Sequence, residues 1–481
     1  MKKQPGWALP DLKAAQVRTT QTVNISHEQF AIPSEWHHLG IGKRFYLRTY
    51  GCQANERDGE TLAGILELMG FTQSDDMEQS DLILLNTCAV RKNAEEKVLG
   101  ELGSLKRLRK QNPNLIFGMC GCMAQEEDIV QLLLEKYPHV ELIFGTHNLH
   151  HLPKLLHQVM EKHEKTIEVF SKEGDIVENL PAKRFGTHKA WVNIMYGCDK
   201  FCTYCIVPYT RGKERSRTME DIIDELNTLK AQGYKEVTLL GQNVNSYGKD
   251  LHIEGGFAKL LTETAKTGIP RIRFTTSHPW DFTQDMIDVI AKYDNIMPFI
   301  HLPVQSGDSD ILKIMGRRYT IEQYKNLFDA IKTKIPNCAF STDIIVGFPN
   351  ETQTQFQHTL DIVDYCRFDN AYTFIYSPRE GTPAANMQDN VDFQTKQERL
   401  AQLNEKVNHY AWENNQKYKD AIVSVLVDGP SKKNPNIYCG YTETNKLVNF
   451  ERMDAKCGDI IQVKIVACKT WSLDGIQVKE K

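Results

Sequence analysis

The fold is decided by the strand-like stretch Ala190-Trp-Val-Asn-Ile-Met-Tyr196 and by the segment directly after it, Gly197-Cys198-Asp-Lys-Phe-Cys202-Thr-Tyr-Cys205. The first part is a short apolar run, which predicts a β-strand. The second part is a loop with three cysteines at x3 and x2 spacing. A structural zinc site normally pairs two Cys or Cys/His hooks, and no second hook follows at a suitable distance.

These cysteines predict an iron–sulfur cluster instead. Thiolates are the ligands of such clusters, and three ligands leave one iron of a cubane open to another molecule. In radical enzymes that molecule is S-adenosylmethionine, whose sulfonium bond is broken by one electron to give a 5′-deoxyadenosyl radical. The sequence therefore predicts a radical-generating [4Fe–4S] cluster on Cys198, Cys202 and Cys205, with Tyr204 as an aromatic lid beside it.

Further strand-like runs follow this loop, with helical stretches between them. A series of βα units predicts a barrel, and six units fall short of a closed one, so we expect a partial (β/α)6 barrel that is open on one side. The predicted helices include residues 218–231, 321–334 and 351–365. The predicted strands are residues 190–196, 236–240, 271–275, 299–304, 339–346 and 371–376.

Residues at the carboxyl ends of these strands are candidates for binding the cofactor, because ligands of parallel α/β folds bind there. Polar side chains could bind the ribose or amino group, and a glycine-bearing loop could offer backbone groups to the methionine end. The alternative for each is an ordinary turn residue whose hydrogen bonds are satisfied locally. The candidates are Tyr204, Gly241, Gln242, Asn243, Ser277, Gln305 and Asp343.

Ahead of the barrel, the apolar runs 44–50, 81–86 and 115–119 each end at a cysteine. Helical stretches separate them, which predicts an open parallel sheet with crossover helices. Cysteines delivered to one edge of that sheet can converge on one object. The predicted second ligand set is Cys52, Cys88 and Cys122, with Cys120 competing for the third place and chance burial as the alternative. The remaining cysteines, Cys338, Cys366, Cys439, Cys457 and Cys468, are interpreted as packing residues.

The two ends of the chain differ from the middle. Residues 1–42 are polar and aperiodic and predict an extension that is partly disordered or draped over the next domain. After the helical connector 394–419, strand-like runs with Gly and Asn turns predict a small all-β barrel of OB-like size. The predicted fold class is α/β, with an open parallel-sheet domain, a partial barrel and a small all-β barrel. The predicted domains are residues 1–42, 43–160, 184–415 and 416–481.

Composition sets limits on partners and compartment. Among 481 residues, 58 are Lys or Arg and 62 are Asp or Glu, which excludes a wholly basic nucleic-acid binder but not a local basic patch. The sequence has no apolar run long enough for a membrane span and no apolar signal-peptide core at its start. We therefore expect a cytoplasmic protein, in which 12 cysteines serve as thiols or metal ligands rather than disulfides.

A basic segment follows the cysteine loop. Its basic residues alternate, so in an extended backbone they would point one way and contact phosphates. The alternative is a solvated charge run that includes Glu214. A target base in an RNA loop would be splayed out into the pocket. The predicted RNA contacts are Arg211, Lys213, Arg215 and Arg217.

Together these motifs resemble the radical-SAM methylthiotransferases. The resemblance is carried by Tyr50-Gly-Cys-Gln-Ala-Asn55, Asn86-Thr-Cys88, Gly121-Cys122 and the segment Gly197–Gly212, and it extends from about Lys43 to the C-terminus. The stretch Ile206-Val-Pro-Tyr-Thr-Arg-Gly-Lys-Glu-Arg-Ser-Arg217 is most similar to the MiaB type, and the C-terminal β-unit is similar to a TRAM domain. Ala54 and Lys213 stand where the family pattern has methionine and arginine, and neither is a ligand.

The resemblance implies a tRNA methylthiotransferase with two [4Fe–4S] clusters. The auxiliary cluster would hold sulfur at its open iron. One S-adenosylmethionine would methylate that sulfur, and a second would give the radical that takes hydrogen from C2 of an N6-isopentenyladenosine beside the anticodon. The implied partners are the tRNA anticodon stem-loop and an electron donor such as flavodoxin or ferredoxin, with the chain acting as a monomer.

Three alternatives stay open at this point. A methylthiotransferase of this family could act on threonylcarbamoyladenosine in tRNA, or on an aspartate of a ribosomal protein. The segment from Tyr209 to Ser216 argues against the ribosomal substrate. The third alternative is a non-catalytic iron–sulfur RNA-binding module, which would tolerate loss of Cys202.

Overall fold

The computed structural model describes residues 7–17, 26–89, 92–162, 164–171, 176–431 and 434–478. The chain forms two compact units. The first consists of Met1–Phe185, Met195–Asp199 and Ile206–Asp221, and the second of Gly186–Ile194, Lys200–Cys205 and Ile222–Lys481. In the part of the chain that is described, no helix is both long and apolar enough to cross a membrane.

A six-stranded parallel sheet forms the centre of the first unit, in the order β3-β2-β4-β5-β6-β7. Every residue of β4 is buried, as expected for a parallel strand that is covered on both faces. The predicted open parallel sheet is confirmed, although three of its strands were not anticipated. The strands are β2 (Arg44–Thr49), β3 (Thr72–Gln73), β4 (Leu82–Thr87), β5 (Ile116–Gly121), β6 (Val140–Phe144) and β7 (Thr166–Glu168).

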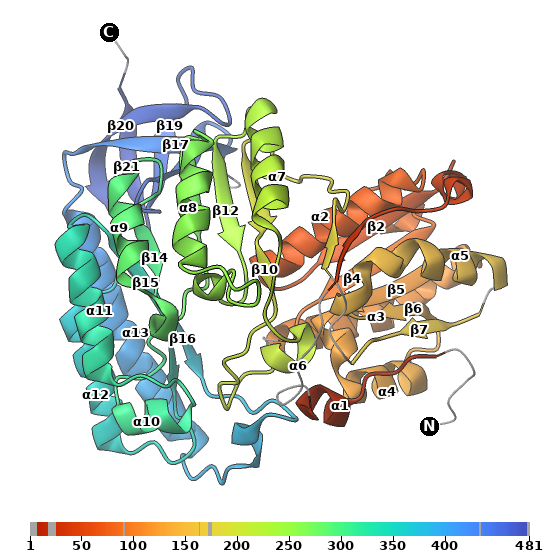
Figure 1. Ribbon diagram of the computed structural model, residues 1–481, viewed down its shortest axis with the longest axis horizontal. Coiled ribbons are helices and arrows are strands. Elements are labelled where there is room, and N and C mark those ends of the chain that lie inside the picture. Colours follow the sequence, from red (N-terminus) through yellow and green to blue (C-terminus); the bar gives the residue numbers. More distant parts are fainter. Residues whose placement is uncertain are drawn as a thin grey trace. The chain divides into compact units, whose positions relative to one another are not determined.

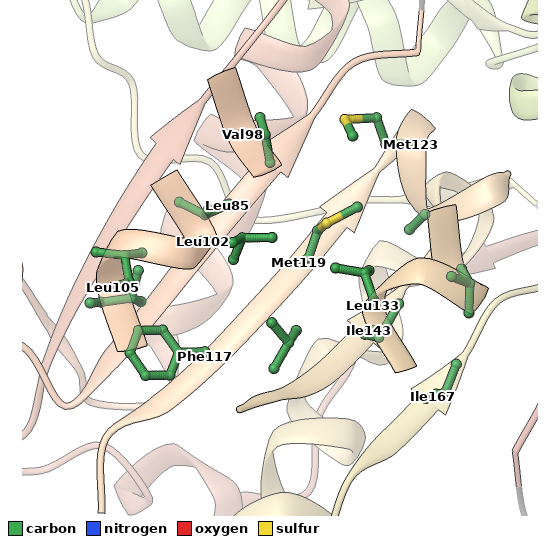
Figure 2. Packing of buried hydrophobic residues seen from close by; sticks show 14 of the residues in the cluster. Leu85, Val98, Leu102, Leu105, Phe117, Met119, Met123, Leu133, Ile143 and Ile167 are labelled. Carbon is green, nitrogen blue, oxygen red and sulfur yellow. The ribbon is translucent and has the colours of Figure 1, made fainter. Parts of the chain in front are cut away.

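Helices pack on both faces of this sheet. Leucines of α2 (Gln53–Leu68) and α5 (Leu152–Lys162) belong to one core cluster, and those of α3 (Lys92–Gln111) and α4 (Glu127–Lys136) belong to another. Figure 2 shows Leu102 and Leu105 of α3 and Leu133 of α4 close to Phe117 and Met119 of β5. Apolar side chains on both faces thus fix the sheet edge at which the strands end.

The described part of the N-terminal extension pairs with strands of this unit. This agrees with an extension draped over the next domain, which was one of the two predicted arrangements. Ala8 forms a parallel bridge with Glu168 of β7, and β1 (His27–Gln29) pairs in parallel with β8 (Ile176–Glu178). The helix α1 (Leu12–Val17) lies between these segments in the chain. Residues 1–6 and 18–25 are outside the described residues.

The second unit contains the predicted partial barrel. Its strands pair in parallel in two sets, β9-β12-β13 and β14-β15-β16, and a single parallel bridge joins Ile272 of β13 to Ile296. Among the described residues, no hydrogen-bonded pairing closes β9 onto β16. The strands are β9 (Lys189–Asn193), β12 (Glu236–Leu240), β13 (Arg271–Phe274), β14 (Phe299–His301), β15 (Ala339–Val346) and β16 (Asn370–Ile375).

One predicted strand is shorter than expected. The run 190–196 ends as β9 at Asn193, and Met195–Tyr196 forms a separate strand, β10. This strand pairs antiparallel with β11 (Arg215–Ser216) in the first unit. The backbone turns at Gly197, whose φ of 78° is strained for residues other than glycine.

Helices of the second unit follow the predicted ranges closely. Capping boxes at Thr320 and Thr352 begin α11 and α12, because the threonine side chain satisfies a backbone N–H that the first turn leaves open. In Figure 1, α9, α11 and α12 run along the outside of β14 and β15. The helices are α7 (Met219–Ala231), α8 (Gly256–Lys266), α9 (Gln284–Lys292), α10 (Ser309–Ile314), α11 (Ile321–Lys334), α12 (Gln353–Cys366) and α13 (Phe393–Gln416).

The C-terminal part of the second unit is a closed barrel in the order β17-β18-β19-β21-β20, drawn in blue in Figure 1. Its interior is filled by aliphatic and aromatic side chains such as Val427, Phe450 and Ile465, which confirms the predicted small all-β barrel. The strands are β17 (Ile422–Pro430), β18 (Ile437–Thr442), β19 (Leu447–Glu451), β20 (Ile460–Cys468) and β21 (Leu473–Gln477).

Two buried arginines of β13 tie this barrel to the core strands. Arg271 donates to the backbone oxygens of Tyr441 and Ser424 at 2.8 and 3.1 Å. Arg273 donates to the backbone oxygens of Thr442 and Glu443, and its Nε donates to Glu236 at 2.8 Å. Buried guanidinium groups with such partners hold the barrel against the first strands of the core.

Replacing Arg271 with methionine is expected to loosen the barrel from the core. The variant loses charge-assisted hydrogen bonds that are each worth about 2 kcal/mol, so amides of β17 and β18 should exchange faster in hydrogen–deuterium exchange. Lys235→Met, which changes an exposed residue beside the same strands, should leave these amides unchanged. Equal exchange in Arg271→Met and the unmodified protein would contradict the anchoring role.

Candidate iron–sulfur centres

The cysteines Cys52, Cys88 and Cys122 follow three adjacent strands of the first unit. Cys52 lies at the N-cap of α2, directly after β2. Cys88 follows β4, and Cys122 begins the short 3-10 helix Cys122–Gln125 after β5. Since β2, β4 and β5 are neighbours in a parallel sheet, their carboxyl ends bring these cysteines to one edge.

Cys52 and Cys88 are in direct contact. A hydrogen bond with Cys88 lowers the pKa of the Cys52 thiol to about 5, which burial opposes and the charge of Arg211 supports. Gly51 makes the approach possible, because a Cβ at this position would lie 2.8 Å from Cys88 Sγ. Its φ of 114° also favours glycine. The close approach of Cys88 and the positive φ therefore explain why the Tyr50-Gly-Cys motif has glycine at position 51.

Asn55 links the three strand ends. Its side-chain nitrogen donates to the backbone oxygens of Tyr50 at 2.9 Å and Thr87 at 2.8 Å. Its side-chain oxygen lies 3.7 Å from Cys122 Sγ. Asn55 is completely buried, so it fixes the loops that carry the cysteines. It was part of the sequence motif, yet no role was predicted for it.

The structure separates Cys122 from its competitor Cys120. Cys120 belongs to the sheet core with Leu84 and Phe144, and burial raises the pKa of its thiol well above the usual value. Cys122 instead packs with Ala89 and Ile206, and it lies close enough to Cys52 for the two groups to interact electrostatically. The geometry favours Cys122 as the third member of the set.

The sequence of the basic segment after the cysteine loop suggested exposed basic side chains that point one way. In the structure its arginines are buried. Arg211 is buried and donates to Asp58 at 2.7 Å and to Asn55 at 2.6 Å. Arg217 is buried against Glu178, and the buried Arg215 lies over the Tyr196 ring. Carboxylates and a ring of the first unit therefore take up the arginines. RNA contact by Arg211, Lys213, Arg215 and Arg217 stays a prediction.

Replacing Arg211 with methionine should destabilise the first unit strongly. Asp58 would keep a buried charge without its ion-pair partner, which costs about 3–5 kcal/mol, so the midpoint of urea unfolding should fall. The double variant Arg211→Met/Asp58→Leu should recover much of the loss, because replacing a whole buried pair with apolar groups is often neutral. If Arg211→Met were as stable as the unmodified protein, the Arg211–Asp58 ion pair would not stabilise this site.

The loop of Cys198, Cys202 and Cys205 is held separately in each unit. In the first unit, the Cys198 N–H donates to the Gly212 oxygen at 3.0 Å. In the second unit, Lys200 pairs with the buried Asp281 at 2.5 Å, and the Thr203 N–H donates to the Met315 oxygen at 3.0 Å. Residues on both sides of Cys202 are therefore fixed by the fold.

Arg317 is a residue of this region that the sequence reasoning missed. Its guanidinium is buried and donates to Cys202 Sγ at 3.5 Å, to the Pro303 oxygen at 3.0 Å and to the Tyr319 hydroxyl at 3.2 Å. Hydrogen bonds to ligand sulfurs tune iron–sulfur clusters. Nothing in the local sequence distinguishes Arg317 from the exposed Arg318 beside it.

The predicted cofactor residues divide into groups. The amide nitrogen of Asn243 donates to Ser246 in its own loop and to Asp281 in the loop after β13, so this amide joins the two loops. Gln305, with a φ of 67°, donates its N–H to the Asp343 oxygen, and these two candidates lie together. The Asp343 carboxylate also lies 3.3 Å from His301.

The remaining candidates are less closely associated. The Ser277 hydroxyl is buried and has no hydrogen-bond partner among the described residues. Tyr204 packs edge-on against Phe348. Gly241 is buried and Gln242 is half-buried. Their roles toward a cofactor stay predictions.

The donor chemistry of both cysteine sets fits iron–sulfur clusters, because thiolates are the usual ligands of such clusters. Within the described ranges, no group of three Cys, His, Asp or Glu side chains is arranged to hold a single metal ion. The assignment of the six cysteines rests on their residue type, their spacing and the contacts described above.

Comparison with known families places three regions. Residues 44–145 match an uncharacterized protein family, UPF0004. Residues 192–363 match the Radical SAM superfamily, and residues 416–478 match the TRAM domain. These matches coincide with the parallel-sheet unit, the partial barrel and the C-terminal closed barrel.

Curated relatives match almost the whole chain. A tRNA-2-methylthio-N(6)-dimethylallyladenosine synthase from Bacillus licheniformis is 57% identical over 472 residues, covering 98% of this chain and 92% of the relative. Enzymes of the same name from Bacillus cytotoxicus and Halalkalibacterium halodurans are 56% and 55% identical. They cover 98% of this chain and 92% and 88% of their own lengths.

Among solved structures, the radical S-adenosylmethionine methyltransferase TsrM from Kitasatospora setae, with cobalamin and a [4Fe-4S] cluster bound, is similar in fold. The TM-score is 0.52 at 15% sequence identity, and the match covers 71% of this chain and 74% of that one. At this identity the similarity concerns the fold alone.

Proposed function

Because the chain belongs to the tRNA-2-methylthio-N6-dimethylallyladenosine synthase family, we propose how its six motif cysteines carry out the reaction of that family. The protein is a radical-SAM methylthiotransferase. It inserts a methylthio group at C2 of N6-isopentenyladenosine in tRNA. The observation that carries this function is the near-complete match to enzymes of that name.

We infer two [4Fe–4S] clusters, one on Cys198, Cys202 and Cys205 and an auxiliary one on Cys52, Cys88 and Cys122. When bound, the first supplies the electron that cleaves S-adenosylmethionine, and the second holds the sulfur to be inserted. Support for the auxiliary set comes from the contact of Cys52 with Cys88 and from the separation of Cys122 from Cys120. Two molecules of S-adenosylmethionine would be used per turnover.

Other side chains hold the loops that carry these cysteines. Asn55 and the Arg211–Asp58 pair hold the strand ends that carry the auxiliary cysteines. Lys200 and Arg317 hold the second half of the radical loop against the partial barrel. Gln305, which follows β14, and Asp343, within β15, are the predicted contacts for the ribose or amino group of S-adenosylmethionine.

The partner assignments are extensions of the same proposal. The substrate is a tRNA anticodon stem-loop, and the TRAM-type barrel is a suitable RNA-binding surface. A small electron carrier such as flavodoxin or ferredoxin would supply the electrons. We propose that the enzyme acts as a monomer in the cytoplasm, where its tRNA substrate is found and thiols stay reduced.

The proposal is tested by the stoichiometry of the reconstituted enzyme with tRNA that carries N6-isopentenyladenosine. Each modified adenosine should be accompanied by about one S-adenosylhomocysteine, from methyl transfer, and about one 5′-deoxyadenosine, from radical formation. Liquid chromatography with mass spectrometry measures all three. Product formed with deoxyadenosine but without S-adenosylhomocysteine would rule out the two-step use of the cofactor.

Arg317→Lys is expected to lower the reduction potential of the radical cluster. Lysine cannot reproduce the planar fork that reaches Cys202 Sγ, the Pro303 oxygen and the Tyr319 hydroxyl, and losing an N–H donor to a ligand sulfur disfavours the reduced state. Redox titration followed by electron paramagnetic resonance measures the potential, in a background that lacks the auxiliary cysteines. Arg318→Lys, at the exposed neighbour, is the matched control, and equal potentials in both variants would refute the role.

A further inference from the structure

One thiol of the C-terminal barrel lies outside the cluster sites and next to two groups that can activate it. Cys457 Sγ is 3.4 Å from Nδ1 of His188. Nε2 of the same ring is 3.1 Å from the carboxylate of Asp428. Cys457 is exposed, so its interpretation as a packing residue was wrong. The three side chains form a continuous Cys–His–Asp series of contacts within the second unit.

Each of these three residues is positioned by the fold. His188 directly precedes β9, Asp428 is in β17, and Cys457 is in the turn between β19 and β20. The N–H of Gly458 donates to the Val427 oxygen at 2.9 Å, which holds the turn. A Cβ at Gly458 would lie 3.1 Å from His188 Cβ, so this glycine allows the turn to approach the ring.

His188 shares the Asp428 carboxylate with a neighbouring lysine. The Asp428 carboxylate is also paired with Lys189 at 2.6 Å, and Lys189 lies 3.9 Å from Glu236. Cys457 Sγ lies 3.2 Å from the backbone oxygen of Asp428, so the thiol can donate to this oxygen or to the ring. With Nε2 held by the carboxylate, Nδ1 lies 3.4 Å from the sulfur and 3.5 Å from the Thr187 hydroxyl, and it can accept the thiol proton.

We propose that Cys457 is a nucleophilic thiol, activated by His188 and Asp428, and a site of reversible modification by small disulfides. In this step the thiol proton moves to His188 Nδ1. The Cys457 sulfur forms a bond to one sulfur of the disulfide, the original S–S bond breaks, and the second half leaves as a thiolate that takes a proton. The disulfide is the oxidant, and the exchange reverses with excess thiol.

Two other cysteines of the same barrel provide internal comparison. Cys439 and Cys468 are half-buried, and burial raises the pKa of both thiols. No histidine is among the described contacts of either residue. If exposure and the histidine govern reactivity, Cys457 should react first and these two slowly.

The test is the rate of alkylation of each cysteine in the anaerobic holoenzyme by iodoacetamide at pH 7, followed by peptide mass spectrometry. The rate at Cys457 should be at least about tenfold higher than that of the same peptide in the denatured protein. His188→Gln keeps a side chain of similar size but cannot take the proton, and it should remove this advantage. Oxidised glutathione should then add a mixed disulfide at Cys457 that dithiothreitol removes.

A second variant keeps the test decisive if His188→Gln folds poorly. Asp428→Asn keeps the shape of the junction and should lower the rate at Cys457 several-fold, because the imidazolium loses its counter-charge. Far-ultraviolet circular dichroism and iron content show whether each variant is intact. A Cys457 rate equal to that of the denatured protein, or unchanged in both intact variants, would overturn the proposal.

Discussion

Replacing Cys202 with alanine is expected to abolish both 5′-deoxyadenosine release and tRNA product. Cys202 is buried in the loop that Lys200 and Arg317 hold. Without its thiolate the radical cluster loses a ligand, and no other thiol of the loop can substitute. Iron content should fall from about eight to about four atoms per chain, because the auxiliary site is untouched. Iron analysis and chromatography of the reaction mixture measure both effects.

Cys468→Ala is the control for this experiment, since it removes a half-buried barrel thiol that the account places in no cluster. It should keep full iron content and full deoxyadenosine release. A Cys202 variant that still cleaves S-adenosylmethionine would place the radical chemistry elsewhere. The alternative of a non-catalytic iron–sulfur module would instead be supported if the unmodified protein itself released no 5′-deoxyadenosine.

Replacing Cys122 with alanine should separate the two functions. The auxiliary cluster is expected to be lost, so methylthio insertion stops, while the radical cluster still cleaves S-adenosylmethionine to 5′-deoxyadenosine. Iron content should again fall to about four atoms per chain. The physical reason is that Cys122 lies on the side of Cys52 and Ile206, at the edge where the strands end.

Cys120→Ala is a matched control only two positions away. Cys120 is buried in the sheet core with Leu84, so its loss should cost a small amount of stability and leave both clusters in place. If Cys120→Ala lost the auxiliary iron and Cys122→Ala kept it, the ligand assignment would be reversed. If neither variant lost iron, the auxiliary cluster would not use this strand.

Much of this arrangement could be read from the sequence, because cysteines followed apolar runs. The runs that became β2, β4 and β5 are neighbouring strands, of which β4 and β5 are buried, and strand ends of a parallel sheet meet at one edge. In the small barrel the sequence predicted strands only at residues 421–427, 447–450 and 459–467, so β18 and β21 were missed. Gly440 and Gly475 interrupt their patterns, and their pairing comes from barrel closure rather than from local preference.

Residues that act through distant partners could not be predicted in this way. The sequence predicts that Arg211 is an exposed phosphate contact. In the structure it is paired with Asp58, which is far away in the sequence. Arg317 is 115 positions from Cys202, and the Arg–Arg pair in the sequence does not say which one is buried. Cys457 was likewise assigned to packing, although His188 and Asp428 meet it only in the folded unit.

Nucleoside mass spectrometry shows directly what becomes of tRNA that carries N6-isopentenyladenosine after incubation with the reconstituted enzyme, S-adenosylmethionine and a reductant. We expect conversion to 2-methylthio-N6-isopentenyladenosine, and no conversion with the Cys202 or Cys122 variants. Unchanged N6-isopentenyladenosine with the intact two-cluster enzyme, or methylthiolation of threonylcarbamoyladenosine instead, would contradict the assignment of this substrate and of these ligands.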